Sequence, residues 1–435
     1  MGVKENQIIP NWPLWLLPAV LLLLPMWRVG FYDVGMFLDD AGIVFIYARN
    51  LLETGQIFYN VPTDRLDGFT SFIDVLFAVP LALIAPDSMY SWNFYLKALI
   101  TSFIPVFMYF LLLRWGLSRM SAFLLAAAFA SSDVLSAAFG MQLEGPLYAL
   151  GITAFFSCLF SRKNNLMIGL TVTGCVLCLT RPEAPALVAL ALGLVICLDD
   201  DKQRRISAFY AGLMVGVALF AWYLWRIFYF GFWAPNTYYA KMSGSRLQEL
   251  SDGLEFISYH FLNRADVFLY LALFVLMLGC TRAVFSGDRD ERLTDCLVAG
   301  LVALGMLGVR LFTGGDSYQI SARLLLDFAM PALFSIGLGL SVYRSGAMRN
   351  IIAGLVVMAL LGNGLFLARN FPENIAAGFL RMERTSRISL SCERSAVRRV
   401  HAEFPNARLA HTDFQRAKYF ASDLELIDLS GLNNK

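Results

Sequence analysis

The stretch LMIGLTVTGCVLCLTRPEAPALVALALGLVICL, residues 166–198, decides the fold class. Two apolar runs, 166–180 and 184–198, flank a short turn that carries Arg181 and Glu183, each followed within two residues by a proline. A helix that crosses a membrane needs about 17–25 predominantly apolar residues. Two such runs joined by a charged turn predict a pair of membrane helices.

The same pattern recurs along the whole chain of 435 residues. Twelve apolar runs lie at about 12–29, 72–86, 94–113, 120–138, 145–160, 166–180, 184–198, 206–229, 263–280, 295–312, 326–343 and 349–367. The chain is 58% hydrophobic and 16% charged, and its mean hydropathy is +0.60. A soluble chain carries about 25% charged residues, and a membrane barrel shows short alternating segments. The sequence therefore predicts an all-α polytopic membrane protein.

The placement of basic residues predicts the orientation, because short loops rich in Lys and Arg stay cytoplasmic. These clusters are Arg162/Lys163, Lys202/Arg204/Arg205, Arg282/Arg289/Arg292 and Arg344/Arg349. The segments predicted to lie on the opposite, outer side of the membrane are then residues 30–71, 231–262, 313–323 and the tail from about 368. A cytoplasmic N-terminus and an outside tail require an odd number of crossings, so we expect about 11 transmembrane helices. Run 72–86, with Asp74, Pro80 and Pro86, is the run that we expect not to cross.

Two parts are expected, a membrane domain over 1–367 and a small soluble tail over 368–435.

The net charge of +2 gives no general attraction to nucleic acid. The sequence has no Walker A loop, no G-x-G-x-x-G after a strand and no nucleophile elbow. The polar strings gather instead in the outside segments. This asymmetry predicts that the chemistry takes place at the outer membrane boundary.

Asp39 and Asp40 lie in the first outside segment, before a stretch with the apolar spacing of a helix. We expect this helix to lie along the interface, with Arg49 and Glu53 on its polar side and Gly55 just past its end. One aspartate is a natural N-cap, worth about 1 kcal/mol. A second acid there needs a metal, an arginine or a substrate hydroxyl as its partner.

Further candidates follow along the outside segments. Arg65 suits bidentate phosphate recognition, whereas Asp67 is a substrate ligand or simply pairs with Arg65. Glu144 at the start of an apolar run is a functional acid or a charge stabilised by a helix dipole. Arg181 and Glu183 pair within their own turn, or Arg181 faces a polar headgroup.

Later outside strings add more candidates. Asn236 in WAPNTYYAK is a plausible N-cap, and Lys241 lies outside against the usual bias, which favours an anionic lipid phosphate as its partner. Asp316 lies in the turn GGDS, and Arg323 follows it by two helical turns.

This inventory suits glycosyl transfer from a lipid phosphate. An aspartate would remove the proton of the acceptor hydroxyl. Arg or Lys would stabilise the departing phosphate, with or without a divalent metal such as Mg²⁺, Mn²⁺ or Ca²⁺. The residues considered for such a metal are Asp39, Asp40 and Glu144. Asp40 is favoured over Asp39 as the base.

Seven strings in this order resemble the GT-C glycosyltransferase superfamily, and more narrowly the membrane arabinofuranosyltransferases that use polyprenyl-phosphate-arabinofuranose. They are LDDAGIVFIYARNL, DRLDGFTS, GMQLEGPLYAL, LTRPEA, PNTYYAK, GGDSYQISARLLL and IDLSGLN, which span about 37–433. Asp67 stands where this family has Glu. The tail is far shorter than the large C-terminal domain of the mycobacterial members, which favours the size of the type IV pilin arabinosyltransferases.

The resemblance implies a GT-C helical bundle and an inverting transfer in an outside-facing cavity. Asp39 and Asp40 match the family's first-loop acidic motif and Glu144 its second acid. Arg65, Arg181, Lys241 and Arg323 match polar positions near the donor. The implied partners are a lipid-linked sugar donor, the bilayer and an acceptor protein such as pilin, or a polysaccharide, at the bacterial inner membrane. An oligosaccharyl-type transferase and a lipid-linked sugar transporter are the alternatives.

Overall fold

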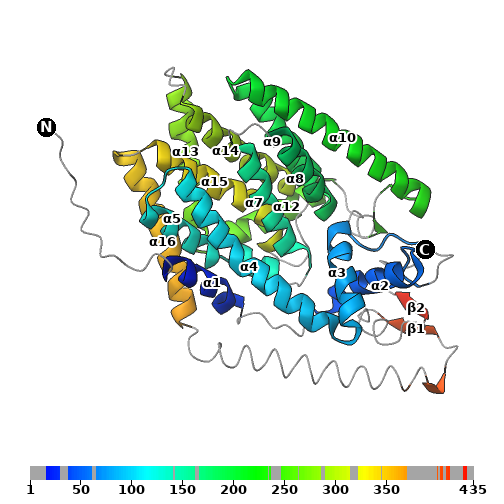
Figure 1. Ribbon diagram of the computed structural model, residues 1–435. Helices are drawn as coiled ribbons and strands as arrows, with labels where there is room; N and C mark the ends of the chain where they lie inside the picture. The colour runs from blue at the N-terminus through cyan, green and yellow to red at the C-terminus, as the bar shows by residue number, and fades with distance from the viewer. Residues whose placement is uncertain are drawn as a thin grey trace.

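The computed structural model describes most of the predicted membrane domain and short parts of the tail (Figure 1). The described residues are 16–29, 38–60, 65–140, 143–161, 166–233, 235–236, 246–262, 264–285, 290–313, 322–343, 345–369, 399, 402–404, 408–411 and 425–428.

Each of the predicted apolar runs coincides with a helix or with a pair of helices. These are α1 (Leu16–Val29), α3 (Phe72–Ile84), α4 (Met89–Arg114), α5 (Arg119–Ala130), α6 (Asp133–Gly140), α7 (Gly145–Leu159), α8 (Leu166–Thr180), α9 (Ala184–Leu198), α10 (Lys202–Phe230), α13 (Val267–Phe285), α14 (Glu291–Phe312), α15 (Leu326–Val342) and α16 (Ala347–Arg369). Two further helices, α2 (Leu38–Thr54) and α12 (Arg246–Leu262), lie in the predicted outside segments. The helical fold class is confirmed.

Within the described residues, five helical stretches are long and apolar enough to cross a membrane. They are Pro86–Arg114, Lys202–Phe230, Glu291–Phe312, Ala322–Val342 and Ala347–Leu365. The number rises to seven if each of two bent helix pairs is one span. The 13-residue α3 and the 15-residue α8 and α9 are all shorter than a straight crossing requires. The count of about 11 crossings therefore stays a prediction.

Run 120–138 is broken where the sequence predicts one continuous helix. Helices α5 and α6 meet at an angle of 52°. The hydroxyl of Ser131 donates to the carbonyl oxygens of Ala127 and Ala128 at 2.9 and 3.1 Å. A serine hydroxyl that bonds back to the preceding turn competes with the backbone and bends a helix. The break follows from this local competition.

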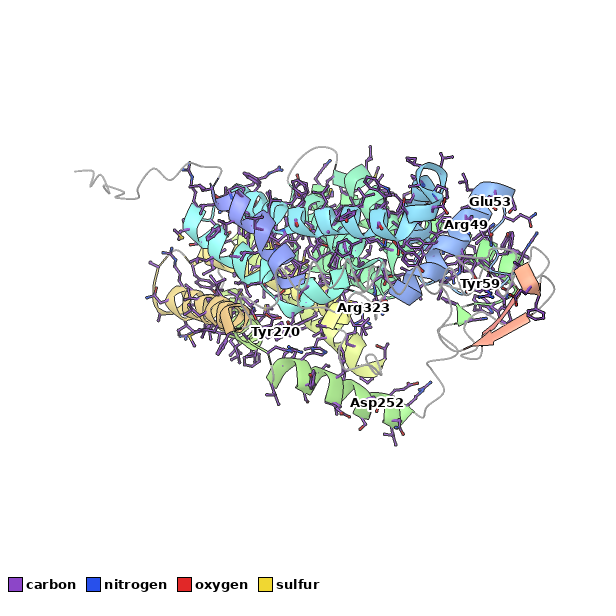
Figure 2. The ribbon with its side chains drawn as sticks, turned by 90° about the horizontal axis from the view of Figure 1, so that it is seen from below. Arg49, Glu53, Tyr59, Asp252, Tyr270 and Arg323 are labelled. Carbon is purple, nitrogen blue, oxygen red and sulfur yellow. The ribbon has the colours of Figure 1, made fainter. Side chains whose placement is uncertain are left out.

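Helices α2 and α3 form a small second core beside the main bundle. Residues 41–48 of α2 are buried, and they pack in one cluster with α3, the first half of α4, Phe139 and Phe230. Gly55 has a φ of +69° just past α2, as predicted. The Ser71 hydroxyl caps α3 by accepting from the Asp74 amide at 3.1 Å. Figure 2 shows Arg49 and Glu53 at the end of the molecule where α2 lies.

The tail contains the one sheet among the described residues. Strands β1 (Arg408–His411) and β2 (Glu425–Asp428) pair in parallel, with Arg408 opposite Glu425. In both Figures 1 and 2 they lie near the end of the molecule that carries α2. The all-helical prediction thus holds for the bundle, and the tail adds a small sheet.

Candidate active site

The turn between α8 and α9 lies at the centre of a buried charged network. Arg181 Nε lies 2.7 Å from Glu183 Oε1, so the predicted pairing within the turn is present. Arg181 Nη1 also lies 2.6 Å from Oε1 of Glu144, which directly precedes α7. The short turn is set by Pro182 and Pro185, which end α8 and start α9. Arg181 thus pairs within its own turn, as one of the two alternatives predicted, and it also reaches across to another helix. Its contact with a polar headgroup stays a prediction.

The network continues into α14 and α15. Arg310, in the last turn of α14, donates to Glu183 and also to Asp327 in the first turn of α15, at 2.7 Å for the second bond. Asp327 is 0% exposed. Glu183 is thus shared by two guanidinium groups from different elements.

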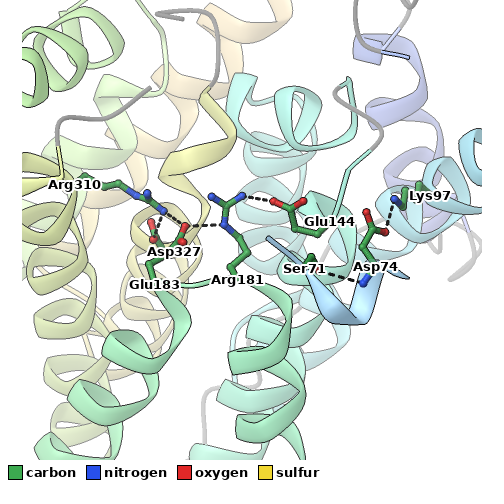
Figure 3. Close-up of polar contacts among 8 residues, drawn as sticks. All are labelled: Ser71, Asp74, Lys97, Glu144, Arg181, Glu183, Arg310 and Asp327. Carbon is green, nitrogen blue, oxygen red and sulfur yellow. Dashed lines mark hydrogen bonds and ion pairs between the residues drawn. The ribbon is translucent and has the colours of Figure 1, made fainter. Parts of the chain in front are cut away.

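On the other side of Glu144 lies a second ion pair. Lys97 Nζ of α4 is 2.6 Å from Asp74 Oδ1 of α3, and both side chains are 1% exposed. The carboxylates of Asp74 and Glu144 are close enough to repel each other. Figure 3 shows that the two groups of charges are neighbours in one row. This charged row consists of Lys97, Asp74, Glu144, Arg181, Glu183, Arg310 and Asp327.

Glu183 and Arg181 of the charged row are held in their ionised forms by neighbouring members. Burial alone would raise the pKa of Glu183, but Arg181 and Arg310 together hold it below the ordinary value. Burial alone would lower the pKa of Arg181, but Glu183 and Glu144 raise it. Removing one partner from a buried ion pair is costly because it leaves a charge without compensation. The row therefore fixes the ends of α7, α9, α14 and α15 relative to one another.

A separate buried ion pair attaches the first predicted outside loop to α10. Both Nε and Nη2 of Arg226 donate to Asp67 Oδ2, the first at 2.9 Å. Asp67 is 0% exposed, and burial raises its pKa to about 6 despite the opposing effect of Arg226. The predicted pairing of Asp67 with Arg65 is wrong. Arg65 is exposed, and its guanidinium carbon lies 4.4 Å from the centre of the Tyr229 ring.

The charged row and the Asp67–Arg226 pair lie at the same end of the bundle. Near the opposite end of α10, Arg204 bonds to Asp199 at 2.5 Å, to Asp295 at 2.6 Å and to the carbonyl of Leu159. Asp199 follows α9, whereas Glu183 precedes it. The Arg181 end of the bundle is therefore opposite to the Arg204 end, where the predicted cytoplasmic basic cluster lies.

The remaining candidates are placed as follows. Asp39 and Asp40 lie in the first turn of α2, which begins before both of them at Leu38, and their side chains lie outside the described residues. The Asn236 amide donates to the carbonyl oxygen of Asp67 at 2.8 Å. Arg323 is buried in the 3-10 turn Ala322–Leu325 that leads into α15 (Figure 2).

Lys241 and Asp316 lie outside the described residues. Within the part of the chain that the structure describes, no group of three or more His, Cys, Asp or Glu side chains could hold a metal ion. Glu144 is engaged by Arg181. The metal site at Asp39, Asp40 and Glu144 thus stays a prediction.

Five members of the charged row and of the Asp67–Arg226 pair were not among the sequence candidates. They are Asp74, Lys97, Arg226, Arg310 and Asp327. Each is an ionisable residue inside a predicted apolar run, toward the end of the run that faces outside. Ionisable residues at such positions are functional or structural signals in membrane proteins. That signal was available in the sequence.

The fold is similar to that of two solved proteins, ArnT and the oligosaccharyltransferase AglB. ArnT from Cupriavidus metallidurans bound to undecaprenyl phosphate matches with a TM-score of 0.59 and 15% identity, over 96% of this chain and 86% of that chain. Its apo structure matches with a TM-score of 0.60 and 12% identity, with the same coverage.

The oligosaccharyltransferase AglB from Archaeoglobus fulgidus, in complex with an inhibitory peptide and a dolichol-phosphate, matches with a TM-score of 0.54 and 13% identity. That match covers 95% of this chain and 64% of AglB. No protein-family model matches the sequence, and no curated protein matches it either. At these identities the likeness establishes the GT-C type of membrane fold.

Proposed function

We propose that this protein is a polyprenyl-phosphate-sugar-dependent glycosyltransferase of the bacterial inner membrane that acts on the periplasmic face. One observation carries the proposal. Seven ionisable side chains are buried in a row at one end of a bundle that shares its fold with ArnT and AglB. A transporter is expected to place such groups near the bilayer midplane along a path. Their position at helix ends favours the enzyme.

In the proposed reaction, the oxygen of an acceptor hydroxyl attacks the anomeric carbon of the sugar. The bond from that carbon to the phosphate oxygen breaks with inversion, and polyprenyl phosphate leaves with the electron pair. Asp40 or Asp39 takes the proton of the hydroxyl. A cation such as Arg65 or Lys241 stabilises the developing charge on the phosphate.

The charged row has a supporting part in this scheme. Its members bond mainly to one another, so their work is to hold the helix ends and the start of α3 in fixed positions. Fixed supports matter because a reacting group displaced by about 1 Å can lower a rate by about 100-fold. Arg323, four residues before Asp327, is positioned by the same helix end.

The sugar is proposed to be D-arabinofuranose and the acceptor a pilin Ser or Thr or a glycan. The lipids bound to ArnT and AglB, undecaprenyl phosphate and dolichol-phosphate, support a polyprenyl-phosphate donor. The peptide bound to AglB supports a protein acceptor and keeps an oligosaccharyl-type transfer of a whole lipid-linked glycan as the second candidate.

Two donors compared side by side test the proposal. Purified full-length protein in detergent receives polyprenyl-phosphate-arabinofuranose or polyprenyl-phosphate-mannose together with a pilin peptide, and released polyprenyl phosphate is measured. Release from the arabinose donor alone is the expected result. Release from the mannose donor alone would overturn the sugar assignment, and release from neither would overturn the proposed monosaccharide transfer.

A further inference from the structure

The segment between α2 and α3 is attached to the last two turns of α10 by several different contacts. The amide of Ile57 donates to the hydroxyl of Tyr229 at 2.8 Å. The guanidinium of Arg65 lies over the ring of the same tyrosine at 4.4 Å. Phe69 and Phe230 meet edge to face with 6.1 Å between their ring centres. Positions far apart in the sequence are therefore joined at one place.

Asp67 is the centre of this attachment. Its carboxylate accepts two hydrogen bonds from Arg226. On either side of it, the Tyr47 hydroxyl donates to the carbonyl of Leu66 at 2.7 Å and accepts from the amide of Gly68 at 3.0 Å. The amide of Asn236 donates to the carbonyl of Asp67 itself at 2.8 Å. Helix α2 and segment 235–236 thus fix the backbone around this residue, and α10 holds its side chain.

The surroundings of α10 explain why a directional contact matters here. In the most apolar stretch of α10, 18 residues long, a share of 17% is buried inside the protein. The same share for α14 is 56%. Helix α10 packs on α8 and α9 and presents much of its surface outward. Apolar side chains could hold α10 against the loop equally well, because a buried ion pair often stabilises a protein no more than an apolar pair of the same size does. A guanidinium that bonds one carboxylate through two nitrogens adds fixed geometry.

We propose that Asp67 and Arg226 are positioning residues for the transfer reaction. They hold Arg65, two residues before Asp67, and the body of α2 in one fixed arrangement, without touching the substrate. This inference rests on the proposed function, since it assigns the pair an effect on the same reaction. Asp67 then acts through Arg226 and is not itself a ligand of the donor.

Variants of the pair separate positioning from simple stability. Full-length protein in lipid nanodiscs is compared as wild type, Arg226→Met, Arg226→Lys and the double variant Asp67→Arg with Arg226→Asp. The matched control is Arg205→Met, which makes the same change at an exposed position of the same helix. Two quantities are measured. One is the rate of backbone hydrogen exchange in peptides that cover residues 55–71, and the other is kcat and KM for cleavage of polyprenyl-phosphate-arabinofuranose.

Arg226→Met is expected to accelerate exchange in 55–71 and to lower kcat by about 10- to 100-fold, with KM changed by less than about threefold. Arg226→Lys and the charge-reversed pair recover part of kcat, and Arg205→Met matches wild type in both quantities. Unchanged exchange in Arg226→Met would overturn the attachment. Unchanged kcat per folded molecule would overturn its catalytic importance. If wild type cleaves no donor, the proposed function fails, while the exchange data still decide whether the pair holds the segment.

Discussion

Arg181 Nη1 lies 2.6 Å from Glu144 Oε1, although the two residues are 37 positions apart in the chain. The contact joins the turn between α8 and α9 to the beginning of α7, and Arg181 also pairs with Glu183. The guanidinium is therefore the link between two acids that the sequence presents in separate strings. This relationship joins Glu144 to the Arg181, Glu183, Arg310 and Asp327 part of the charged row.

Replacing Arg181 by Met leaves Glu144 with no cation from the α8–α9 turn and leaves Glu183 with Arg310 alone in the row. Loss of one partner from a buried ion pair costs about 3–5 kcal/mol. We expect the Arg181→Met protein to unfold at a clearly lower temperature in detergent. Arg399→Met is the matched control, since Arg399 is 82% exposed in its ion pair with Glu403. Equal loss of stability in both variants would contradict the account.

Gly145 follows Glu144 and allows α7 to approach α6 closely. A Cβ added at Gly145 would lie 2.4 Å from the carbonyl oxygen of Ala138, a backbone atom that cannot move cheaply. Gly145→Ala should cost about 1–3 kcal/mol and displace Glu144. Gly193→Ala in α9 meets nothing within 4 Å, so it should be neutral or stabilise the protein by up to about 1 kcal/mol. Thermal unfolding of the two variants checks this difference in sign.

The Tyr47 hydroxyl satisfies two backbone groups beside Asp67. Tyr47→Phe leaves the Leu66 carbonyl and the Gly68 amide without that partner, and we expect a loss of about 1–3 kcal/mol. Tyr95→Phe serves as control because Tyr95 is 59% exposed. Denaturation in detergent should show almost no change for the control. A Tyr47→Phe protein as stable as the control would show that these bonds contribute nothing.

The raised pKa of Asp67 predicts how stability and activity depend on pH. Burial raises this pKa from 3.8 to about 6, although the positive charge of Arg226 in α10 acts to lower it. The folded state therefore binds the proton of the Asp67 carboxyl more tightly than the unfolded state does. The stabilisation of the folded state by this proton is complete below about pH 3.8 and is lost as the pH rises through about 6.

The charged pair with Arg226 forms over the same range, so kcat should rise with pH between about 5 and 7. Asp67→Asn is expected to flatten both the stability profile and the activity profile in this window. Identical profiles in the variant and in wild type would rule out Asp67 as the titrating group.

Local signals in the sequence predicted much of the fold. Each apolar run became a helix, or a pair of helices in the case of run 120–138, because its length and hydropathy leave few other choices in a membrane. The place of Gly55 just past α2 was predicted, and the Ser71 cap of α3 is an equally local feature, since both roles depend on a few neighbouring residues. The pairing of Arg181 with Glu183 is equally local.

The partners across the bundle could not be predicted in the same way. Asp67 pairs with Arg226, which is 159 positions away, rather than with the nearby Arg65. Arg310 joins Glu183 to Asp327 because the ends of α14 and α15 meet the turn before α9. Such pairings depend on which helices pack against one another, and the local residue pattern of a single sequence does not specify that packing. The break at Ser131 was missed because the run is apolar on both sides.

The central claim is tested most directly at Asp39 and Asp40. Purified wild type, Asp39→Asn and Asp40→Asn receive polyprenyl-phosphate-arabinofuranose and a pilin peptide, and the release of polyprenyl phosphate is followed over time. Thermal unfolding confirms that all three proteins are folded. We predict that wild type releases polyprenyl phosphate and that Asp40→Asn, while folded, releases none. Full turnover by both variants would contradict the account.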